Sequence, residues 1–512
     1  MSRYQLVCVV GSAPPAPIAH NTPVDRALAD APPSHAEPSV ALPRLGLALA
    51  VITMAAAAFA TRFWHLGRRS IWLDEAWGWR TTTLSLRGAV DWAADSKDPP
   101  LYYFVLRAVT DVFGDGEGAL RAPSAIAGAL TVLLVAFVAW RAAGPVAGGV
   151  AGALLLGNAS ALVFAQEARM YPLLGLLALA ASAALARLLA RPTPSRAVLY
   201  AALASALVYT HYAGLVVLGV HAALIALYGG LRWRDSGDRG ALVAGYGALV
   251  TTAIIYAPWA PNLWRHSTAG AFYIPPPDRG LFGDVVRAQS GMGDDLLVVA
   301  FVVVLAPFAA LAVARRWREP LVGCVAALAL VPVALGVYSY AVTPVLDVRQ
   351  ASPYIPATAF LAGLAVDEVV RRLRSAGDLA RSAAIALGAA AVALAAISAG
   401  RAMRDAYGAG PIEDWRAAAT EARATGGPVW VWRRYASTPL RYELGDGDIR
   451  EVPPAVFNGA PLDAPPGQPA VLLLSHETPE ERATLLRVFA GAYNVGLPRP
   501  LPGITVVPMA PR

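Results

Sequence analysis

The sequence predicts a polytopic α-helical membrane protein that carries a small α/β domain at its carboxyl end. Of the 512 residues, 56% are hydrophobic and only 15% are charged, whereas soluble domains carry roughly 25% charged residues. Long uncharged runs recur between residues 45 and 400, and the composition becomes that of a soluble domain after Arg401. These observations exclude a single soluble globular protein, and the hydrophobic content excludes a disordered chain.

The charge and the cysteine content exclude further classes of protein. The formal net charge is +7, but the arginines gather in loops between the apolar runs, so the excess does not indicate a nucleic-acid partner. Cys8 and Cys324 are too few and too far apart for a disulfide framework or a zinc finger. Neither a phosphate-binding loop nor a dinucleotide fingerprint occurs in the chain.

The membrane domain is expected to cover residues 42–401, after a Pro- and Ala-rich tail at 1–41 that is expected to be disordered and cytoplasmic. A membrane-spanning helix needs about 20 mainly apolar residues. The run at 197–231 is too long for one span, and we divide it at Thr210–Tyr212, which gives about eleven spans in total. The uncharged runs are 45–61, 122–140, 142–166, 170–186, 197–231, 240–264, 296–314, 320–346, 350–366 and 382–400.

The placement of arginine predicts the orientation, because cytoplasmic loops carry an excess of Arg and Lys. With a cytoplasmic amino terminus, five inner loops are basic, and an odd number of spans puts the carboxyl end outside. The inner loops hold Arg141, Arg187, Arg191, Arg196, Arg232, Arg234, Arg239, Arg315, Arg316, Arg318, Arg371, Arg372, Arg374 and Arg381. The outer loops hold most of the acids, namely Asp74, Glu75, Asp98, Glu167, Asp278, Asp294 and Asp347.

One apolar segment within the first outer loop, residues 99–114, decides whether the number of membrane spans is odd or even. Arg107 and Asp111 lie on it, and about 15 residues are short for a span. We therefore expect a helix that lies at the outer surface or dips in and returns. If it crossed the membrane, the later loops would invert and the arginine pattern would fail.

The outer domain, residues 402–512, is expected to alternate helices with strands. An amphipathic helix is predicted at 413–423 and a second at 479–489. Strands are predicted at 429–432, 470–474 and 504–507. This alternation is typical of a small α/β layer, and about 110 residues suffice for one hydrophobic core.

The first outer loop, 65–120, carries two groups of candidate functional residues. Asp74 and Glu75 lie among tryptophans, which places carboxylates at the headgroup level of the membrane. They are read either as a general base near the surface or as an ordinary acidic helix start. Lys97, the only lysine in the chain, and Asp98 precede two prolines. They could bind a phosphate or a metal, or form a surface pair at the start of the 99–114 helix.

Later outer turns add further charged residues. Glu167 and Arg169 lie in a tight turn at the mouth of the bundle, where charges are functional by default, the alternative being a snorkelling arginine. His211 is either a site residue or structural. Arg349 lies in the last membrane turn, and its planar fork suits phosphate oxygens. Lys97, Arg169 and Arg349 could form one anion pocket or serve as three separate interface anchors.

Six motifs, taken in order, resemble the GT-C superfamily of membrane glycosyltransferases, especially glycosyltransferase family 39, the protein O-mannosyltransferase and aminoarabinose-transferase group. The resemblance extends over about residues 45–370. The motifs are W-L-D-E-A at 72–76, D-P-P-L-Y-Y at 98–103, L-R-A-P-S-A at 120–125, Q-E-A-R-M-Y at 166–171, T-H-Y at 210–212 and R-Q-A-S-P-Y at 349–354.

The resemblance implies an enzyme that takes a sugar from a polyprenyl-phosphate donor at the outer face of the cell membrane. It implies that Asp74 is the catalytic base, with Glu75 orienting the base or the acceptor. The donor phosphate is expected at Lys97, Arg169 and Arg349. Relatives hold His or Glu, in some cases with a divalent metal, where this chain has Asp98, so a metal at Asp98 is one possibility. Substrate contacts are expected from Tyr102, Tyr103, Glu167, Tyr171 and His211.

Direct displacement at the sugar would invert the anomeric centre, and the prenyl tail would lie in a groove between spans, open to lipid. The acceptor, a glycan, lipid or protein, stays open, as does the sugar. Two rival functions remain at this point. A transporter or flippase of a lipid-linked sugar predicts charges near the bilayer midplane and inverted repeats. A receptor or scaffold built around the outer domain would leave the rim charges without a purpose.

Overall fold

The computed structural model describes residues 41–96, 98–268, 274, 276–375, 377, 382, 397, 400–401, 403–445, 447–463, 465 and 467–512. The expected disordered tail, Lys97 and most of the expected span at 382–400 lie outside these residues. The chain separates into two compact units, residues 1–52 and 53–512. The first is described only from Ala41, where it forms the start of helix α2.

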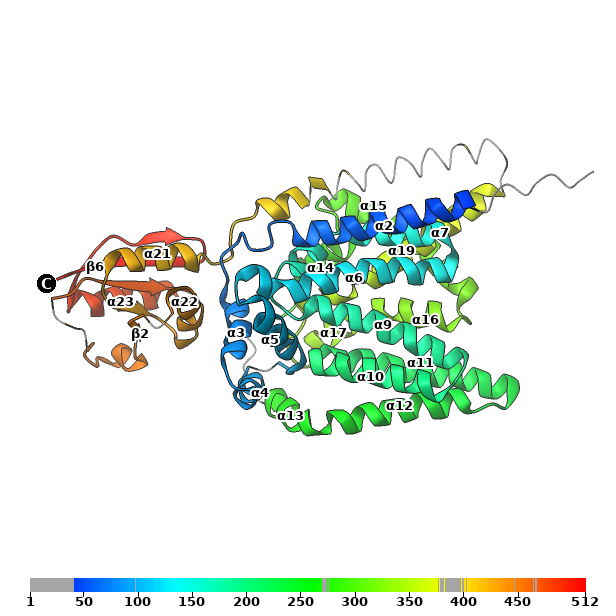
Figure 1. Cartoon of the computed structure of the whole chain (residues 1–512), viewed down its shortest axis with the longest axis horizontal. Coiled ribbons are helices and arrows are strands. Elements are labelled where there is room, and N and C mark those ends of the chain that lie inside the picture. The colour runs from blue at the N-terminus through cyan, green and yellow to red at the C-terminus, as the bar shows by residue number, and fades with distance from the viewer. Residues whose placement is uncertain are drawn as a thin grey trace, which may run out of the picture. The chain divides into compact units, whose positions relative to one another are not determined.

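Long apolar helices dominate the second unit (Figure 1). The helices of the membrane part are α2 (Ala41–Phe63), α6 (Glu117–Ala143), α7 (Pro145–Leu156), α8 (Ala159–Ala165), α9 (Tyr171–Ala190), α10 (Pro194–Thr210), α11 (Ala213–Ser236), α12 (Gly240–Tyr256), α15 (Asp295–Arg316), α16 (Pro320–Ala326), α17 (Val331–Ala341) and α19 (Ile355–Arg374). Shorter helices join them, namely α3 (Leu73–Thr83), α4 (Leu86–Asp95), α5 (Leu101–Phe113), η1 (Ala257–Trp259), α13 (Ala260–Thr268), α14 (Arg279–Ser290), η2 (Ala327–Leu330), α18 (Val348–Ala351) and η3 (Ser352–Tyr354).

Within the described residues, eight helical segments are long and apolar enough to cross a membrane. The pair α7 and α8, bent by 61° at its break, makes a ninth if it counts as one span. Helix α10 has 17 residues, which is at the lower limit for a span. Eight of the eleven expected spans are therefore present as long apolar helices, and the protein is a multi-pass membrane protein. The other three correspond to the bent pair, to α10 and to the segment at 382–400 that lies mostly outside the described residues.

The expected surface helix at 99–114 is present as α5, which has 13 residues. At a rise of about 1.5 Å per residue it is roughly 20 Å long, shorter than the hydrocarbon core of about 30 Å. It packs against α3 and α6. Aromatic side chains fill the core here, including Trp79, Tyr102 and Tyr103, all of which are buried.

The bundle core has two main clusters of small and branched side chains. One lies where α6 packs against α7, α9 and α19. The other lies among α9, α10, α11 and α12. Gly175 allows α9 to pack closely against η3, because a Cβ at this position would lie 2.9 Å from the carbonyl oxygen of Pro353. The chain before α9 and the chain before η3 are thus held side by side.

The carboxyl-terminal domain is a six-stranded sheet with helices on both faces (Figure 1). Its strands run in the order β2-β1-β3-β6-β4, and β5 pairs with β6. Strand β1 is parallel to β2 and β3, whereas β3, β4 and β5 are antiparallel to β6. The elements are α21 (Trp415–Thr425), β1 (Val429–Val431), η4 (Arg434–Ala436), α22 (Ser437–Leu444), β2 (Ile449–Glu451), η5 (Pro454–Asn458), β3 (Ala470–Leu474), α23 (Pro479–Ala490), β4 (Tyr493–Val495), β5 (Arg499–Leu501) and β6 (Ile504–Pro511).

Alternating side chains give this sheet two cores. Val429 and Val431 join a cluster with α21 and α22, while Trp430 joins one with α23. The three strands and two helices expected from the sequence are present. Strands β2, β4 and β5 were not predicted, because each is only three residues long and lacks a clear alternating pattern.

Candidate functional site

Asp74 is the second residue of α3, and it meets a residue from a much later part of the membrane domain's sequence. Its Oδ2 accepts a hydrogen bond from Nη1 of Arg349 over 3.1 Å, across 275 positions of sequence. The guanidinium of Arg349 also lies over the ring of Trp72, 4.6 Å from the ring centroid. The side chains of Asp74 and Arg349 are 28% and 30% exposed, so a ligand can reach both groups.

A second ion pair adjoins the first. Nη2 of Arg169 lies 3.7 Å from Oδ2 of Asp98, and Nη1 of Arg169 donates to the backbone carbonyl of Asp74 over 3.4 Å. The hydroxyl of Tyr103 donates to the same Asp98 oxygen over 2.9 Å. Arg169 therefore contacts both Asp74 and Asp98. We call the group of four residues the rim site, namely Asp74, Asp98, Arg169 and Arg349.

Glu75 lies beneath this site and is almost fully buried. Its two oxygens accept hydrogen bonds from Nε and Nη2 of Arg121, each over 2.7 Å. One of them also accepts from the backbone N–H of Ala168, over 2.8 Å. Glu75 thus ties α3 to α6 and to the turn that bears Arg169. Its predicted role in orienting the base or the acceptor stays a prediction.

Glu167 is 5% exposed, and none of the described residues donates a hydrogen bond to its Oε2. Burial, reinforced by the nearby carboxylate of Glu75, raises the pKa of Glu167 to about 7. It lines a small cavity together with Arg69, Trp72 and Glu75. A carboxyl group of this kind can exchange a proton near neutral pH.

The remaining predicted residues lie around Arg169. The ring of Tyr171 packs against His211, with the centroids 6.0 Å apart. Nδ1 of His211 accepts from the backbone N–H of Ala213, and burial lowers the pKa of His211 to about 4, so the ring is neutral near pH 7. The hydroxyl of Tyr102 contacts Oγ of Ser124 over 2.8 Å, and Ser124 donates to the carbonyl of Arg169. Tyr102 therefore supports the turn rather than facing the exposed ion pair.

Comparisons with known proteins bear on this arrangement. Residues 97–259 match the family described as dolichyl-phosphate-mannose-protein mannosyltransferase. Among curated proteins, none matches the sequence significantly.

Solved structures match over most of the chain. ArnT from Cupriavidus metallidurans in the apo state has a TM-score of 0.60 and 16% identity, and the match covers 90% of this chain and 97% of that one. The same protein bound to undecaprenyl phosphate gives 0.58 and 17%, with the same coverage. The archaeal oligosaccharyltransferase AglB from Archaeoglobus fulgidus, in complex with an inhibitory peptide and a dolichol-phosphate, gives 0.51 and 12%, covering 77% of this chain and 63% of that one.

The chain has the GT-C fold. The resemblance that the six motifs indicated is thereby confirmed at the level of the fold.

Lys97, which was predicted to share an anion pocket with Arg169 and Arg349, lies outside the described residues. The possibility of a metal at Asp98 finds no support in the donor set. Within the parts of the chain that the structure describes, no three His, Cys, Asp or Glu side chains gather closely enough to hold a metal ion. Asp98 instead faces the guanidinium of Arg169 and the phenol of Tyr103. The positive charge of Arg169 would repel a metal cation at this carboxylate.

Two residues that contact α3 had no predicted role. Arg121 falls within the L-R-A-P-S-A motif, and a charge inside an otherwise apolar helix was the signal that could have identified it. Its remaining N–H groups donate to the carbonyls of Leu66, Arg69 and Ser70. Glu413 was assigned only to an amphipathic helix, and no local sequence pattern shows that it contacts α3.

Proposed function

We propose that the protein transfers a sugar from a polyprenyl-phosphate donor to an acceptor hydroxyl at the outer face of the membrane, with inversion at the anomeric carbon and Asp74 as general base. The observation that carries the proposal is the rim site itself. Residues separated by up to 275 positions bring a partly exposed carboxylate within 3.1 Å of an equally exposed guanidinium, beside a second acid–arginine pair.

The reaction needs two kinds of group, and the rim site holds both. Polyprenyl phosphate is a good leaving group, so it needs cations near the phosphate as negative charge develops. Arg349 and Arg169 supply them. The acceptor hydroxyl needs a base on the opposite side of the sugar, and Asp74 supplies it. The acceptor oxygen forms a bond to the anomeric carbon, its proton passes to Asp74, and the carbon–phosphate oxygen bond breaks with its electrons leaving on the phosphate.

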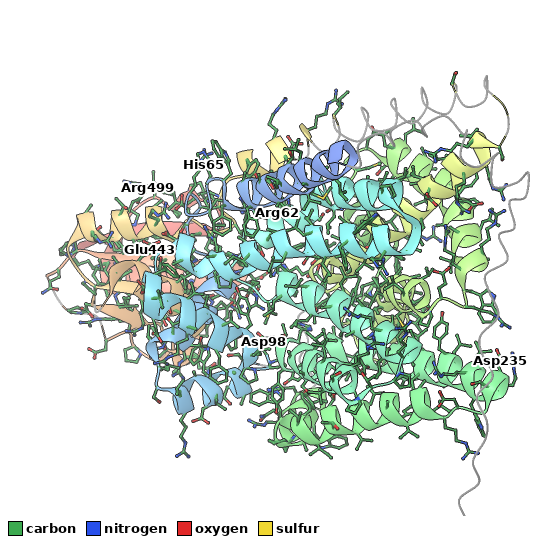
Figure 2. All side chains as sticks on the ribbon, turned by 45° about the vertical axis from the view of Figure 1, so that its right-hand side comes forward. Arg62, His65, Asp98, Asp235, Glu443 and Arg499 are labelled. Atoms are coloured by element: carbon green, nitrogen blue, oxygen red, sulfur yellow. The ribbon has the colours of Figure 1, made fainter. Side chains whose placement is uncertain are left out.

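The distribution of charge along the bundle supports an outer location. Asp235, which lies next to Arg234 in the arginine-rich last turn of α11, is at the far end of the bundle from Asp98 (Figure 2). Arginine-rich loops stay on the cytoplasmic side, so the rim site would face outward. The carboxyl-terminal domain is bonded to the end that carries Asp98, through Glu413 to Leu73 and through Arg416 to Glu117, and would share the compartment of the rim site.

A lipid-linked donor fits the surroundings of the rim site. A cavity of about 430 Å³ lies between α8 and the start of α18, with a lining that includes Val163, Phe164 and Val348. Val348 directly precedes Arg349, so a prenyl chain in this cavity would have its phosphate near that guanidinium. ArnT and AglB have been solved with polyprenyl phosphates bound, and both share the fold of this chain.

The test uses purified protein in detergent, incubated with a panel of radiolabelled polyprenyl-phosphate sugars and with cell-envelope lipids, glycans and proteins as acceptors. We expect the wild-type protein to consume one donor and release polyprenyl phosphate. The Asp74→Asn variant should lose turnover by about 10²-fold or more, since general-base catalysis contributes roughly 10²–10⁴-fold. The matched control is Asp95→Asn, whose side chain is 79% exposed.

Three outcomes would contradict the proposal. Undiminished turnover in Asp74→Asn would remove Asp74 as the base. Retention of configuration in the product would exclude a single displacement. Movement of the donor across a proteoliposome membrane, without its consumption by any acceptor tested, would favour the flippase.

A further inference from the structure

Glu413 joins the carboxyl-terminal domain to the helix that carries Asp74. It lies just before α21 and is 2% exposed. Its Oε2 accepts a hydrogen bond from the backbone N–H of Leu73 over 2.9 Å. The contact crosses 340 positions of sequence, and Leu73 is the first residue of α3. Asp74 follows directly, so this bond acts one residue from the proposed base.

The start of α3 needs such an acceptor. The first N–H groups of a helix have no partner within the helix, and Trp72 at the N-cap position has a side chain that makes no capping hydrogen bond. A carboxylate at this end is also attracted to the partial positive charge of the helix dipole, which stabilises the helix. Glu413 therefore does for α3 what a local Ser or Asp does for other helices, but from a separate domain.

The carboxylate of Glu413 is itself fixed by its own domain. The indole N–H of Trp415 donates to Oε2 over 2.7 Å, and Nε2 of His476 lies 2.6 Å from Oε1. Gly503 leaves room for it, because a Cβ there would lie 2.8 Å from Cγ of Glu413. The backbone of Gly503 has a φ of +64°, which favours glycine for a second reason.

Two further contacts hold the domain against α3 and the chain before it. The backbone N–H of Arg416 donates to Oγ of Ser70 over 3.1 Å. Nearer the middle of α3, the ring of Tyr442 from α22 meets Trp79 edge to face at 5.3 Å. Because the helix contacts the domain at its start and again near its middle, its position depends on the domain as well as on the bundle.

We infer that Glu413 is a positioning residue for Asp74, so that the carboxyl-terminal domain sets the geometry of the base through one hydrogen bond to Leu73. This inference rests on the proposed function. It assigns the domain a part in catalysis that does not require it to touch either substrate. A displacement of about 1 Å at a reacting group can cost about 10²-fold in rate, so loss of the bond should lower turnover.

The test compares Leu73→Pro with Leu73→Ala. Proline removes the N–H that Glu413 binds, yet it is favourable at the first position of a helix. The preceding residue must then be extended, and Trp72 already is, with φ −115° and ψ 173°. Alanine removes the same side chain but keeps the N–H. The two variants therefore differ in this N–H and in the proline ring that replaces it, and the comparison of Glu413→Gln with Glu413→Ala tests the hydrogen bond without that ring.

We expect Leu73→Pro to lower kcat by about 10-fold to 100-fold relative to Leu73→Ala, with the donor KM unchanged within about twofold. A merely structural role would lower the amount of folded protein and leave the kcat of the folded fraction unchanged. Glu413→Gln, which keeps an acceptor oxygen, should retain more turnover than Glu413→Ala, and this second pair decides the matter if Leu73→Pro does not fold.

The two proposals fail differently. Equal kcat in Leu73→Pro and Leu73→Ala, or equal kcat in Glu413→Gln and Glu413→Ala, would overturn the positioning role while sugar transfer stands. Wild-type protein that consumes no donor from the panel would overturn the proposed function, and this inference with it.

Discussion

The buried pair of Glu75 and Arg121 allows a quantitative prediction about stability. The two side chains are 1% and 3% exposed, and both Glu75 oxygens accept from the guanidinium. Glu75→Gln keeps the shape of the side chain but leaves Arg121 charged, buried and without its counter-charge. Breaking a buried ion pair on one side costs about 3–5 kcal/mol. Glutamine keeps one acceptor oxygen, so one of the two charge-assisted hydrogen bonds is lost at roughly 1.5–3 kcal/mol, and the loss of the negative charge adds to that cost.

The assay is equilibrium unfolding in mixed micelles as the fraction of denaturing detergent rises. We expect Glu75→Gln to lower the free energy of unfolding by about 3–5 kcal/mol. The double variant Glu75→Leu with Arg121→Met should recover much of that loss, since apolar side chains of similar volume replace buried pairs well. Asp111→Asn is the control. Its side chain is 62% exposed and lies 3.7 Å from Arg107, and exposed pairs contribute about 1 kcal/mol or less.

A loss of less than about 1 kcal/mol in Glu75→Gln would refute this reasoning. It would mean that Arg121 reaches water or another acceptor once Glu75 is neutral, and the pair would no longer explain how α3, α6 and the Arg169 turn are held together. A double variant less stable than the single one would point the same way.

Two further perturbations test the charge and the packing around the site. The pKa of Glu167 is about 7 in the fold against 4.5 ordinarily, so the unfolded chain loses this proton first. The free energy of unfolding should therefore fall by about 3 kcal/mol as pH rises from about 4.5 to above 7. Glu167→Gln should remove that part of the pH dependence, and identical pH profiles would contradict the assignment. Gly363→Ala should destabilise by about 1–3 kcal/mol, because its Cβ would lie 2.5 Å from the carbonyl oxygen of Ala147. Gly149→Ala, with nothing within 4 Å, should be neutral or stabilising, and equal unfolding midpoints for the two would refute the clash.

The sequence predicted the membrane helices well because hydrophobicity is a local property. Each uncharged run had only to be compared with the thickness of a bilayer. The short helix α5 was separated from the predicted spans by its length, by the charges of Arg107 and Asp111, and by the arginine pattern of the later loops. The two central strands of the carboxyl-terminal domain were predicted equally well, since β3, for example, is apolar at all five positions and fully buried. Three-residue strands at the edges carry too few residues to show a pattern.

The candidate site was predictable in its members but not in its pairs. The sequence identified four members because a charged side chain at the rim of an apolar bundle is costly and therefore points to a function. These are Asp74, Asp98, Arg169 and Arg349. Nothing in the sequence indicated that Arg349 faces Asp74 or that Arg169 faces Asp98. For the same reason the sequence could not distinguish the roles of Glu75 and Asp74. The two carboxylates are adjacent in the chain, and only the structure shows that Glu75 is buried while Asp74 is partly exposed.

The sequence by itself determined that the chain crosses a membrane many times, which loops are basic, and which residue types lie at the opposite rim. Those properties depend on how each segment partitions between water and lipid, and neighbours along the chain suffice to fix them. Only the tertiary structure decided which charge meets which, and that Glu413 of the carboxyl-terminal domain binds the helix that carries Asp74. Such contacts depend on directions and distances of a few ångströms between segments hundreds of residues apart, and side-chain chemistry read in linear order contains neither.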